Sequence, residues 1–514
     1  MQNEATGNKN EATEASEDEQ QQQAPPRRLS PTVKRALVTS VAGTALLAGV
    51  LVLVPVLQDD GPPPALGPTG RAMAAAGAGA PASLPDLAAL IGDRKAHLRE
   101  HPGDEESWAV LGSAYVERGR RTADYAAYPK AERALRRSLA VRSATEGNVE
   151  ALAGLAALAN ARHEYRAARK WGELAVKQAP KRWTLYPVLL DTYRGLGDHK
   201  AVAKTLERLR ELGSGPAVMV SAARVYRDRG WREDAAVKAS DAAALAETPA
   251  ERAALLHRVG ELAWERGEPA EALRYFRAAL RADRDHHPSL AGKSRALAAL
   301  GRTSAALTGY ESALAKQPLP EYLLELGELQ ESLGTESAAG VQYDILRGRI
   351  KQGSGVGINE ALVLGRFEAD HGDADAAVRR LTAEYKRHPG REVADALGWA
   401  LHRAGDDKKA VKYAKKAMDK GPRSALFFYH RGQIERSLKQ YGSARRHLAA
   451  ALRINPYFSP LLAPLAREAL DALGEPAAGG PAKMHAEPTP TPAPRRPSEP
   501  AASAAPRAAE PTKA

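Results

Sequence analysis

The chain has 514 residues and a formal net charge of +12, from 74 Lys and Arg against 62 Asp and Glu. It has no cysteine, which excludes disulfides and cysteine-ligated zinc. Aromatic residues make up only 5% and no sustained alternation of Val, Ile and Thr is present, so the composition favours an all-α protein with closely packed helices over sheets. A basic chain suits nucleic acid, anionic lipid or an acidic partner, but a solvated, arginine-rich helical surface is the simpler interpretation, and we do not expect a nucleic-acid partner.

The N-terminal segment divides into a polar stretch and an apolar run. Residues 1–34 begin with Glu, Gln, Asn, Ala and Ser, which cannot bury enough apolar surface to offset the entropy of ordering, so we predict disorder. The run from Ala36 to Gln58 holds 23 residues without a charge. As a helix rising about 1.5 Å per residue it covers the roughly 30 Å hydrocarbon core of a bilayer. We therefore predict one transmembrane helix over residues 35–58.

A cleavable signal peptide is the alternative interpretation of this run. The apolar run is longer than a signal peptide requires, and the small-residue stretch AMAAAGAGA (72–80) lies too far downstream to be its cleavage site, which favours a retained anchor. Basic residues precede the run, whereas Asp59 and Asp60 follow it. The positive-inside rule then places the N-terminus in the cytoplasm and the large C-terminal part outside. The expectation is a single-pass protein of the cell membrane.

Two further segments have the composition of linkers and tails. Residues 59–84 are rich in Pro, Gly and Ala and predict a linker. Residues 476–514 are rich in Pro and Ala and predict a disordered tail with local polyproline character. The stretch PTPTPAPRRP within this tail could bind a proline-recognising domain, but a plain spacer is the simpler interpretation.

Between residues 85 and 475 the dominant signal is a period. A small-residue position recurs at 112, 156, 190, 223, 260, 294, 327, 365, 398 and 432, in steps close to 34 residues. Seven residues later a glycine marks a turn in eight of the ten repeats. The glycines are Gly119, Gly197, Gly230, Gly267, Gly301, Gly334, Gly372 and Gly405. Twelve residues after the small position, alanine allows a second helix to approach the first. The alanines are Ala168, Ala235, Ala272, Ala306, Ala339, Ala377, Ala410 and Ala444.

These landmarks resemble the tetratricopeptide-repeat (TPR) family. Trp108, Leu111, Gly112 and Tyr115 match its W-x2-L-G-x2-Y spacing, and Ala272 with Phe276 match A-x3-F. The resemblance covers about three-quarters of the chain and implies an α-solenoid of about ten helix–turn–helix repeats. Residues 84–102 and 457–474 are expected to form single helices that cap its ends. Two stretches depart from the period, RRTADYAAYPK (120–130) and GSGVGIN (353–359), and we expect loops there.

No catalytic or cofactor signature stands out in the sequence. AGKS at 291–294 lacks the upstream glycine of a phosphate-binding loop, because His287 occupies that position. Asp283, Asp285, His286 and His287 could bind a metal ion, but they lie in a turn between repeats and lack helical ligand spacing. We therefore expect no enzyme activity, no metal and no cofactor.

The TPR resemblance implies a concave groove lined by the first helix of each repeat. The groove residues it implies are Asn160, Asp191, Arg194, Arg224, Arg227, His257, Glu261, Trp264, Arg295, Glu328, Arg366, Asp395, Trp399, His402, Tyr429 and Arg436. Arg194, Arg224, Arg227 and Arg295 would form a basic stripe, and Trp264, Trp399 and Tyr429 would be aromatic anchors of the kind that dominate binding energy. Alternatively, the arginines pair with acidic residues of adjacent repeats and the tryptophans only pack.

The sequence thus predicts a membrane-tethered TPR scaffold that binds a protein or peptide partner of unknown identity outside the cytoplasm. The alternative function is a sensing or regulatory module whose basic groove binds an anionic polymer of the cell envelope. Alanine, arginine and glycine usage resembles that of membrane-anchored actinobacterial TPR proteins. Solenoids can pair through either end, which leaves a homo-oligomer open.

Overall fold

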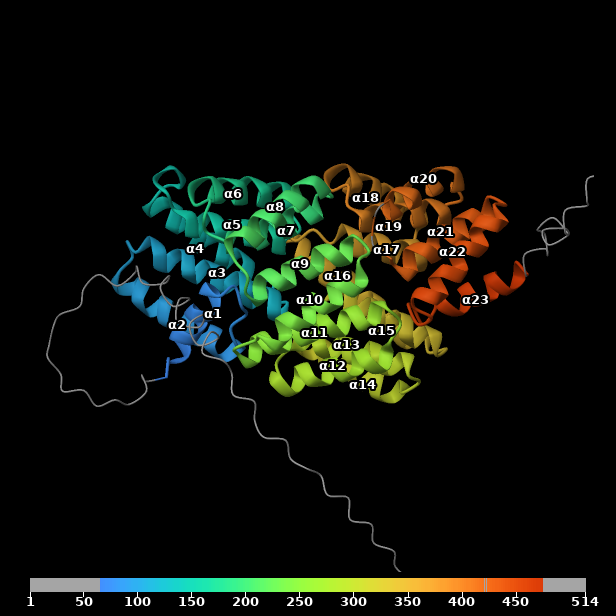
Figure 1. The fold of residues 1–514 in the computed structure, drawn as a ribbon, viewed down its shortest axis with the longest axis horizontal. Coiled ribbons are helices and arrows are strands. Elements are labelled where there is room, and N and C mark those ends of the chain that lie inside the picture. Colours follow the sequence, from blue (N-terminus) through green and yellow to red (C-terminus); the bar gives the residue numbers. More distant parts are fainter. Residues whose placement is uncertain (1–64, 420, 422, 475–514) are drawn as a thin grey trace, which may run out of the picture. The chain divides into compact units, whose positions relative to one another are not determined.

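A computed structural model describes residues 65–419, 421 and 423–474 of the chain (Figure 1). The chain divides into a unit of residues 1–64 and a unit of residues 65–514. The expected N-terminal segment (1–34), transmembrane helix (35–58) and C-terminal tail (476–514) lie outside the described residues. Among the helices that are described, none has the length and apolar character needed to cross a membrane.

The described residues form 23 α-helices, one short 3-10 helix η1 (Ala144–Glu146) and no strand. Twenty of these helices make ten successive helix–turn–helix pairs, which confirms the all-α solenoid. The pairs are α3 (Glu105–Thr122) with α4 (Ala127–Val141), α5 (Val149–Ala161) with α6 (Tyr165–Gln178), α7 (Leu185–Gly195) with α8 (His199–Leu212), α9 (Pro216–Asp228) with α10 (Arg232–Ala244), α11 (Pro249–Glu265) with α12 (Pro269–Ala282), α13 (His287–Ala299) with α14 (Thr303–Lys316), α15 (Pro320–Ser332) with α16 (Glu336–Ser354), α17 (Ala361–His371) with α18 (Ala374–Arg387), α19 (Arg391–Arg403) with α20 (Asp407–Met418), and α21 (Ala425–Ser437) with α22 (Tyr441–Ile454).

Single helices flank the ten pairs at both ends. They are α2 (Leu84–Glu100) and α23 (Leu462–Ala472), close to the expected capping segments. A further helix, α1 (Pro68–Gly77), lies where the composition predicted a linker over 59–84. Proline at its first position and a run of alanines favour a helix. Arg71 Nε also donates to Asp86 Oδ2 of α2 at 3.2 Å, which ties α1 to the solenoid.

Within each repeat the two helices approach closely through small residues. All eight predicted alanines of the second helices are at most 2% exposed. In the repeat formed by α11 and α12, a Cβ at Gly260 would lie only 2.7 Å from Cε1 of Phe276. The landmarks seen in the sequence are therefore the residues that set the distance between paired helices.

The prediction that a glycine forms the turn between the two helices of a repeat is confirmed at six of the eight glycines. Gly197, Gly230, Gly267, Gly301, Gly334 and Gly405 have left-handed φ values between 68° and 85°. Gly119 differs because α3 continues past it to Thr122, so that Ala123 (φ 51°) takes the left-handed position instead. Gly372 also differs, since its φ is −146°. His163 (φ 58°) and Lys439 (φ 60°) end the first helices of the two repeats without a turn glycine.

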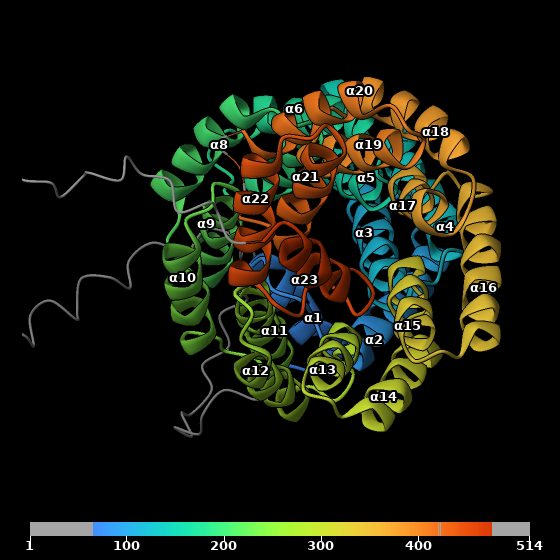
Figure 2. The same ribbon diagram turned by 90° about the vertical axis from the view of Figure 1, so that its right-hand side faces the viewer.

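The repeats of the 65–514 unit wind into a superhelix whose successive turns touch. Figure 2 shows the helices arranged around a ring, with later helices returning over earlier ones. Asn455 Nδ2 donates to the Trp264 carbonyl at 2.8 Å, across 191 residues of sequence. His163 Nδ1 lies 3.0 Å from the Asn359 carbonyl oxygen, 196 residues away. One superhelical turn therefore takes between five and six repeats, and the second turn closes over the first.

Candidate functional site

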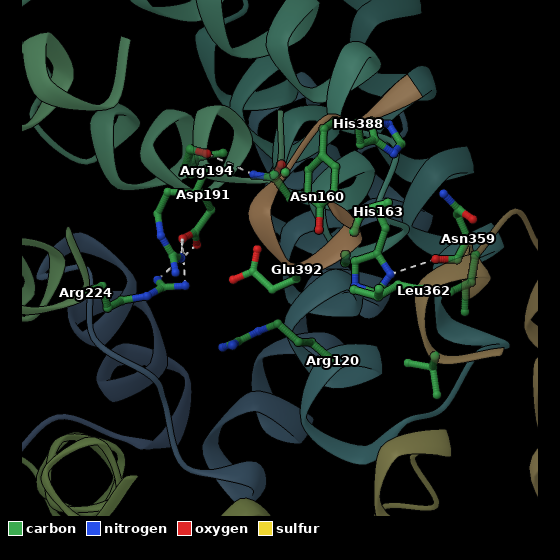
Figure 3. Close-up of a pocket in the computed structure, with 18 of the residues that line it drawn as sticks. Arg120, Asn160, His163, Asp191, Arg194, Arg224, Asn359, Leu362, His388 and Glu392 are labelled. Carbon is green, nitrogen blue, oxygen red and sulfur yellow. Dashed lines mark hydrogen bonds and ion pairs between the residues drawn. The ribbon is translucent and has the colours of Figure 1, made fainter. Parts of the chain in front are cut away.

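The two turns enclose an interior cavity of about 1350 Å³. Its walls come from α3, α5, α7 and α9 of the first turn and from α17 and α19 of the second. Apolar side chains such as Val188 and Leu362 alternate in the wall with charged and amide side chains (Figure 3). This volume exceeds the roughly 300–1,000 Å³ of pockets that bind small molecules. We call this space the interior cavity.

Two of the predicted basic groove residues, Arg194 and Arg224, line the interior cavity, and both form ion pairs. Arg224 Nη2 on α9 lies 2.7 Å from Asp191 Oδ1 on α7. In the opposite direction, Arg194 on α7 donates through Nε to Asp228 on α9. Burial alone would raise the pKa of Asp191, but the charges of Arg224 and Arg194 outweigh it and hold that pKa below its usual range.

The same pattern continues along the next three repeats. Arg227 Nη2 on α9 lies 2.6 Å from Glu265 Oε1 on α11. Arg295 on α13 bridges two neighbours, since its guanidinium lies 3.3 Å from Glu261 and 2.7 Å from Glu325. Burial opposes the ionisation of Glu261, yet Arg295 lowers the pKa of this carboxyl to about 2. We call these inter-repeat pairs, from α7 to α15, the ion-pair ladder.

The ladder changes the interpretation of the predicted basic stripe. Each of its four arginines, Arg194, Arg224, Arg227 and Arg295, faces at least one carboxylate of a neighbouring repeat. The geometry therefore supports the interpretation in which these arginines pair with acidic residues of adjacent repeats, and not the one in which they form a free basic stripe. One arginine that sequence reasoning missed, Arg258 on α11, forms no ion pair among the described residues.

The predicted aromatic anchors are mostly buried. Trp399 and Tyr429 are 5% and 2% exposed and belong to one apolar cluster. Trp399 also donates through Nε1 to Asp370 Oδ1 at 2.8 Å, which links α19 to α17. Trp264 is half-buried, and the Arg295 guanidinium lies 5.7 Å from the centre of its ring. These residues pack the solenoid, and Trp264 alone of the three keeps substantial exposed surface.

The remaining predicted groove residues divide by environment. Asp395 on α19 is buried and lies 2.9 Å from His430 of α21. His402 contacts the carboxylate of Asp407. Burial lowers the pKa of His257 to about 4. Arg366 is half-buried and Arg436 is exposed, and neither forms an ion pair within the described part of the chain. Whether any of these residues binds a partner stays a prediction.

Sequence reasoning missed the cavity residues that the second turn contributes. Glu360, Glu392 and Arg391 line the same space as Asp191 and Arg224. The period shows which helices are neighbours along the chain, but it does not fix the pitch that brings α19 over α7. No pattern in the sequence could have placed these residues together.

The described residues contain no group of three or more His, Asp or Glu suited to a metal ion. In the turn suspected from sequence, Asp283 lies 3.5 Å from Arg121 and His286 Nδ1 lies 2.9 Å from Ser289 Oγ. There is also no positive evidence of a catalytic arrangement in this part of the chain.

Comparison with known families identifies the repeat type. One tetratricopeptide-repeat model matches residues 253–286, and a second matches residues 362–425 and 396–457. These segments are tetratricopeptide repeats. They correspond to the pair α11 and α12 and to the pairs from α17 to α22, and they support the TPR family for the chain. No curated protein matches the sequence at a significant level.

Several solved structures are similar to this chain at low identity. The human IFIT1 dimer with PPP-AAAA is 16% identical, with 61% of this chain and 72% of that chain covered and a TM-score of 0.40. Rap protein complexed with competence and sporulation factor is 13% identical over 60% of this chain and 97% of that chain, with a TM-score of 0.39. The Cut9–Hcn1 hetero-tetramer of APC/C is 16% identical over 76% and 82%, with a TM-score of 0.38. At these scores the similarity carries no argument about function.

Proposed function

We propose that this protein is a TPR scaffold that holds an extended segment of a partner protein in the interior cavity. The observation that carries the proposal is the cavity itself, whose walls come from two successive turns of the superhelix. An extended chain offers backbone donors and acceptors as well as side chains, and the mixed apolar and polar wall complements both.

The observed ion pairs weaken the alternative in which the groove binds an anionic polymer. That hypothesis needed a stripe of free arginines, whereas the four arginines concerned are paired with carboxylates of adjacent repeats. A polymer would have to displace these carboxylates before it could bind. We therefore favour a protein segment.

We further propose that residues 35–58 tether the scaffold to the cell membrane, with the N-terminus in the cytoplasm and the repeats outside. The support is the uncharged run and the basic residues before it. Full-length protein should resist carbonate extraction from membranes, and a variant lacking residues 35–58 should be released. Release of the full-length chain would contradict the tether.

Site-specific photo-crosslinking tests the binding proposal. A photoreactive residue at Val188, in the cavity wall, is compared with one at Val237, which is 57% exposed on α10. We expect one partner segment to be attached at Val188 and not at Val237. Attachment of the same partner at Val237 alone would place binding on the outer surface and contradict the proposal.

A further inference from the structure

One end of the interior cavity is built from the two stretches that depart from the repeat period. Tyr125 follows the extended helix α3, and Ile358 follows the extended helix α16; both are buried in the same apolar cluster. The backbone N–H of Asn359 donates to the Arg162 carbonyl at 2.9 Å. Stretches that the sequence predicted as loops therefore form a wall between the two superhelical turns.

This wall contains a buried carboxyl group with an unsatisfied oxygen. Glu360 is 8% exposed and occupies the N-cap position of α17, but its side chain caps no backbone N–H. Its Oε2 and the hydroxyl of Tyr125 are both buried and make no hydrogen bond of normal geometry among the described residues, although the Tyr125 hydroxyl lies close enough to lower the pKa of Glu360. Leaving such groups unsatisfied is costly, and most buried polar groups in proteins do have partners. Both residues line the interior cavity, where a ligand could satisfy them.

A second carboxyl group lies beside the first. Glu321, in the first turn of α15, is exposed, lines the cavity and forms no ion pair within the described residues. Burial and the charge of Glu321 together raise the pKa of Glu360 to about 7, although His163, Tyr125 and Arg349 act in the opposite direction. A positive charge placed between the two carboxyl groups would relieve this repulsion.

The lining as a whole carries a net negative charge. Eight carboxylates but only five arginines line the interior cavity, a formal surplus of three negative charges with histidines neutral. The carboxylate of Glu392 on α19 reaches into the space between Arg224 and Arg120 in the view of Figure 3. Glu392 forms no ion pair among the described residues. Charge complementarity therefore favours a basic occupant over an acidic one.

We propose that Tyr125, Glu321 and Glu360 form a binding site for the cationic side chain of a lysine or arginine in the partner segment. The inference rests on the proposed function, because it assigns a chemistry to the segment that the cavity holds. Carboxylate oxygens accept charge-assisted hydrogen bonds from guanidinium or ammonium groups. The Tyr125 hydroxyl, which lies at the same wall, supplies a further acceptor, whereas the Tyr125 ring already contacts the Arg349 guanidinium, which lies 4.2 Å from the ring centre.

Peptide binding by the full-length protein tests the inference without the natural partner. The probes are four acetylated and amidated nonapeptides of Ala and Ser that differ only in the central residue, which is Arg, Lys, Gln or Glu. Dissociation constants are measured by isothermal titration calorimetry for wild type, Glu360→Gln and Glu321→Gln. The matched control is Glu311→Gln, an exposed carboxylate on α14 that does not line the cavity. Circular dichroism verifies that every variant is folded.

We expect the Arg and Lys peptides to bind about tenfold more tightly than the Gln peptide, as for one charge-assisted contact. Glu360→Gln and Glu321→Gln should each remove most of this preference, and Glu311→Gln should keep it. Equal binding of all four peptides by wild type, or an unchanged preference in Glu360→Gln, would overturn the inference.

The two proposals fail in different ways. If a partner segment is attached at Val188 but wild type shows no preference for Arg or Lys, the cavity binds a partner and the cationic site is wrong. If the preference depends on Glu360 but no partner reaches Val188, the cationic site is right and the proposed function is wrong.

Discussion

At the residue scale, ion pairs join the first helices of adjacent repeats along the solenoid. The pairs Asp191–Arg224, Arg194–Asp228 and Glu261–Arg295 are separated by 33, 34 and 34 residues. Opposite charges spaced by one repeat are the signal that distinguishes pairing from a free basic stripe.

We expect a large loss of stability when the one arginine of the ion-pair ladder that pairs with two carboxylates, Arg295, is replaced. Arg295→Met leaves Glu261 and Glu325 without their counter-ion, and the side chain of Arg295 is only 22% exposed. We expect a loss of roughly 2 kcal/mol in the free energy of unfolding, which is below the roughly 3–5 kcal/mol of a fully buried pair because water still reaches this site. Hydrogen exchange of α11–α15 and the thermal midpoint measure this loss. Arg136→Met is the control, because Arg136 is 68% exposed in its pair with Glu132 and should leave the midpoint unchanged.

Glu360 predicts a specific pH dependence of stability. Its pKa is raised from 4.5 to about 7 in the folded protein, chiefly by burial and by Glu321, so folding opposes its ionisation. Wild type should therefore lose stability as pH rises from about 4.5 through 7, by up to about 3 kcal/mol, whereas Glu360→Gln should not. Thermal midpoints of the two proteins should coincide near pH 5 and diverge by pH 8. A difference that stays constant with pH would show that Glu360 does not titrate as described.

At the element scale, local signals predicted the helix pairs well and their ends less well. Ten pairs and both capping helices follow the period, because small residues at fixed offsets set how paired helices pack. The helix α1 was missed because its Ala and Gly content resembles a linker, while its order depends on contacts with α2 such as the one from Arg71 to Asp86. The extension of α3 past Gly119 was missed because the turn position moved with the added residues.

We expect Gly→Ala substitutions at two turn glycines with similar backbone angles to have different effects on the contact between superhelical turns. Gly197 (φ 68°) and Gly301 (φ 73°) both end the first helix of a repeat. A Cβ at Gly197 would lie 2.6 Å from the Pro389 carbonyl oxygen on the next superhelical turn, whereas a Cβ at Gly301 meets no atom within 4 Å. Both substitutions to Ala pay about 1–2 kcal/mol for the left-handed conformation. Only Gly197→Ala should also increase hydrogen exchange around residues 389–391; equal effects of the two changes would contradict the contact between turns.

At the scale of the whole molecule, the pitch of the superhelix is the property that the sequence did not predict. Contacts such as Trp264–Asn455 join residues 191 apart, and small rotations at each of the intervening repeats add up to decide whether they form. For the same reason, the sequence located the groove residues of single repeats but not the interior cavity. The cavity and the cationic site both depend on the second turn closing over the first.

A covalent crosslink between the turns tests this closure most directly, because the chain has no cysteine of its own. Arg166 on α6 donates through Nη2 to the Lys386 carbonyl oxygen on α18 at 3.0 Å, across 220 residues of sequence, and both residues are exposed. The double variant Arg166→Cys/Lys386→Cys is treated with a short bismaleimide, and the intrachain link is identified by mass spectrometry of the monomer, with the two single variants as controls. Closed turns predict rapid, nearly complete linkage of the two cysteines in the folded protein. If the two cysteines are not linked, or are linked only between molecules, the turns do not stack and the interior cavity does not exist as described.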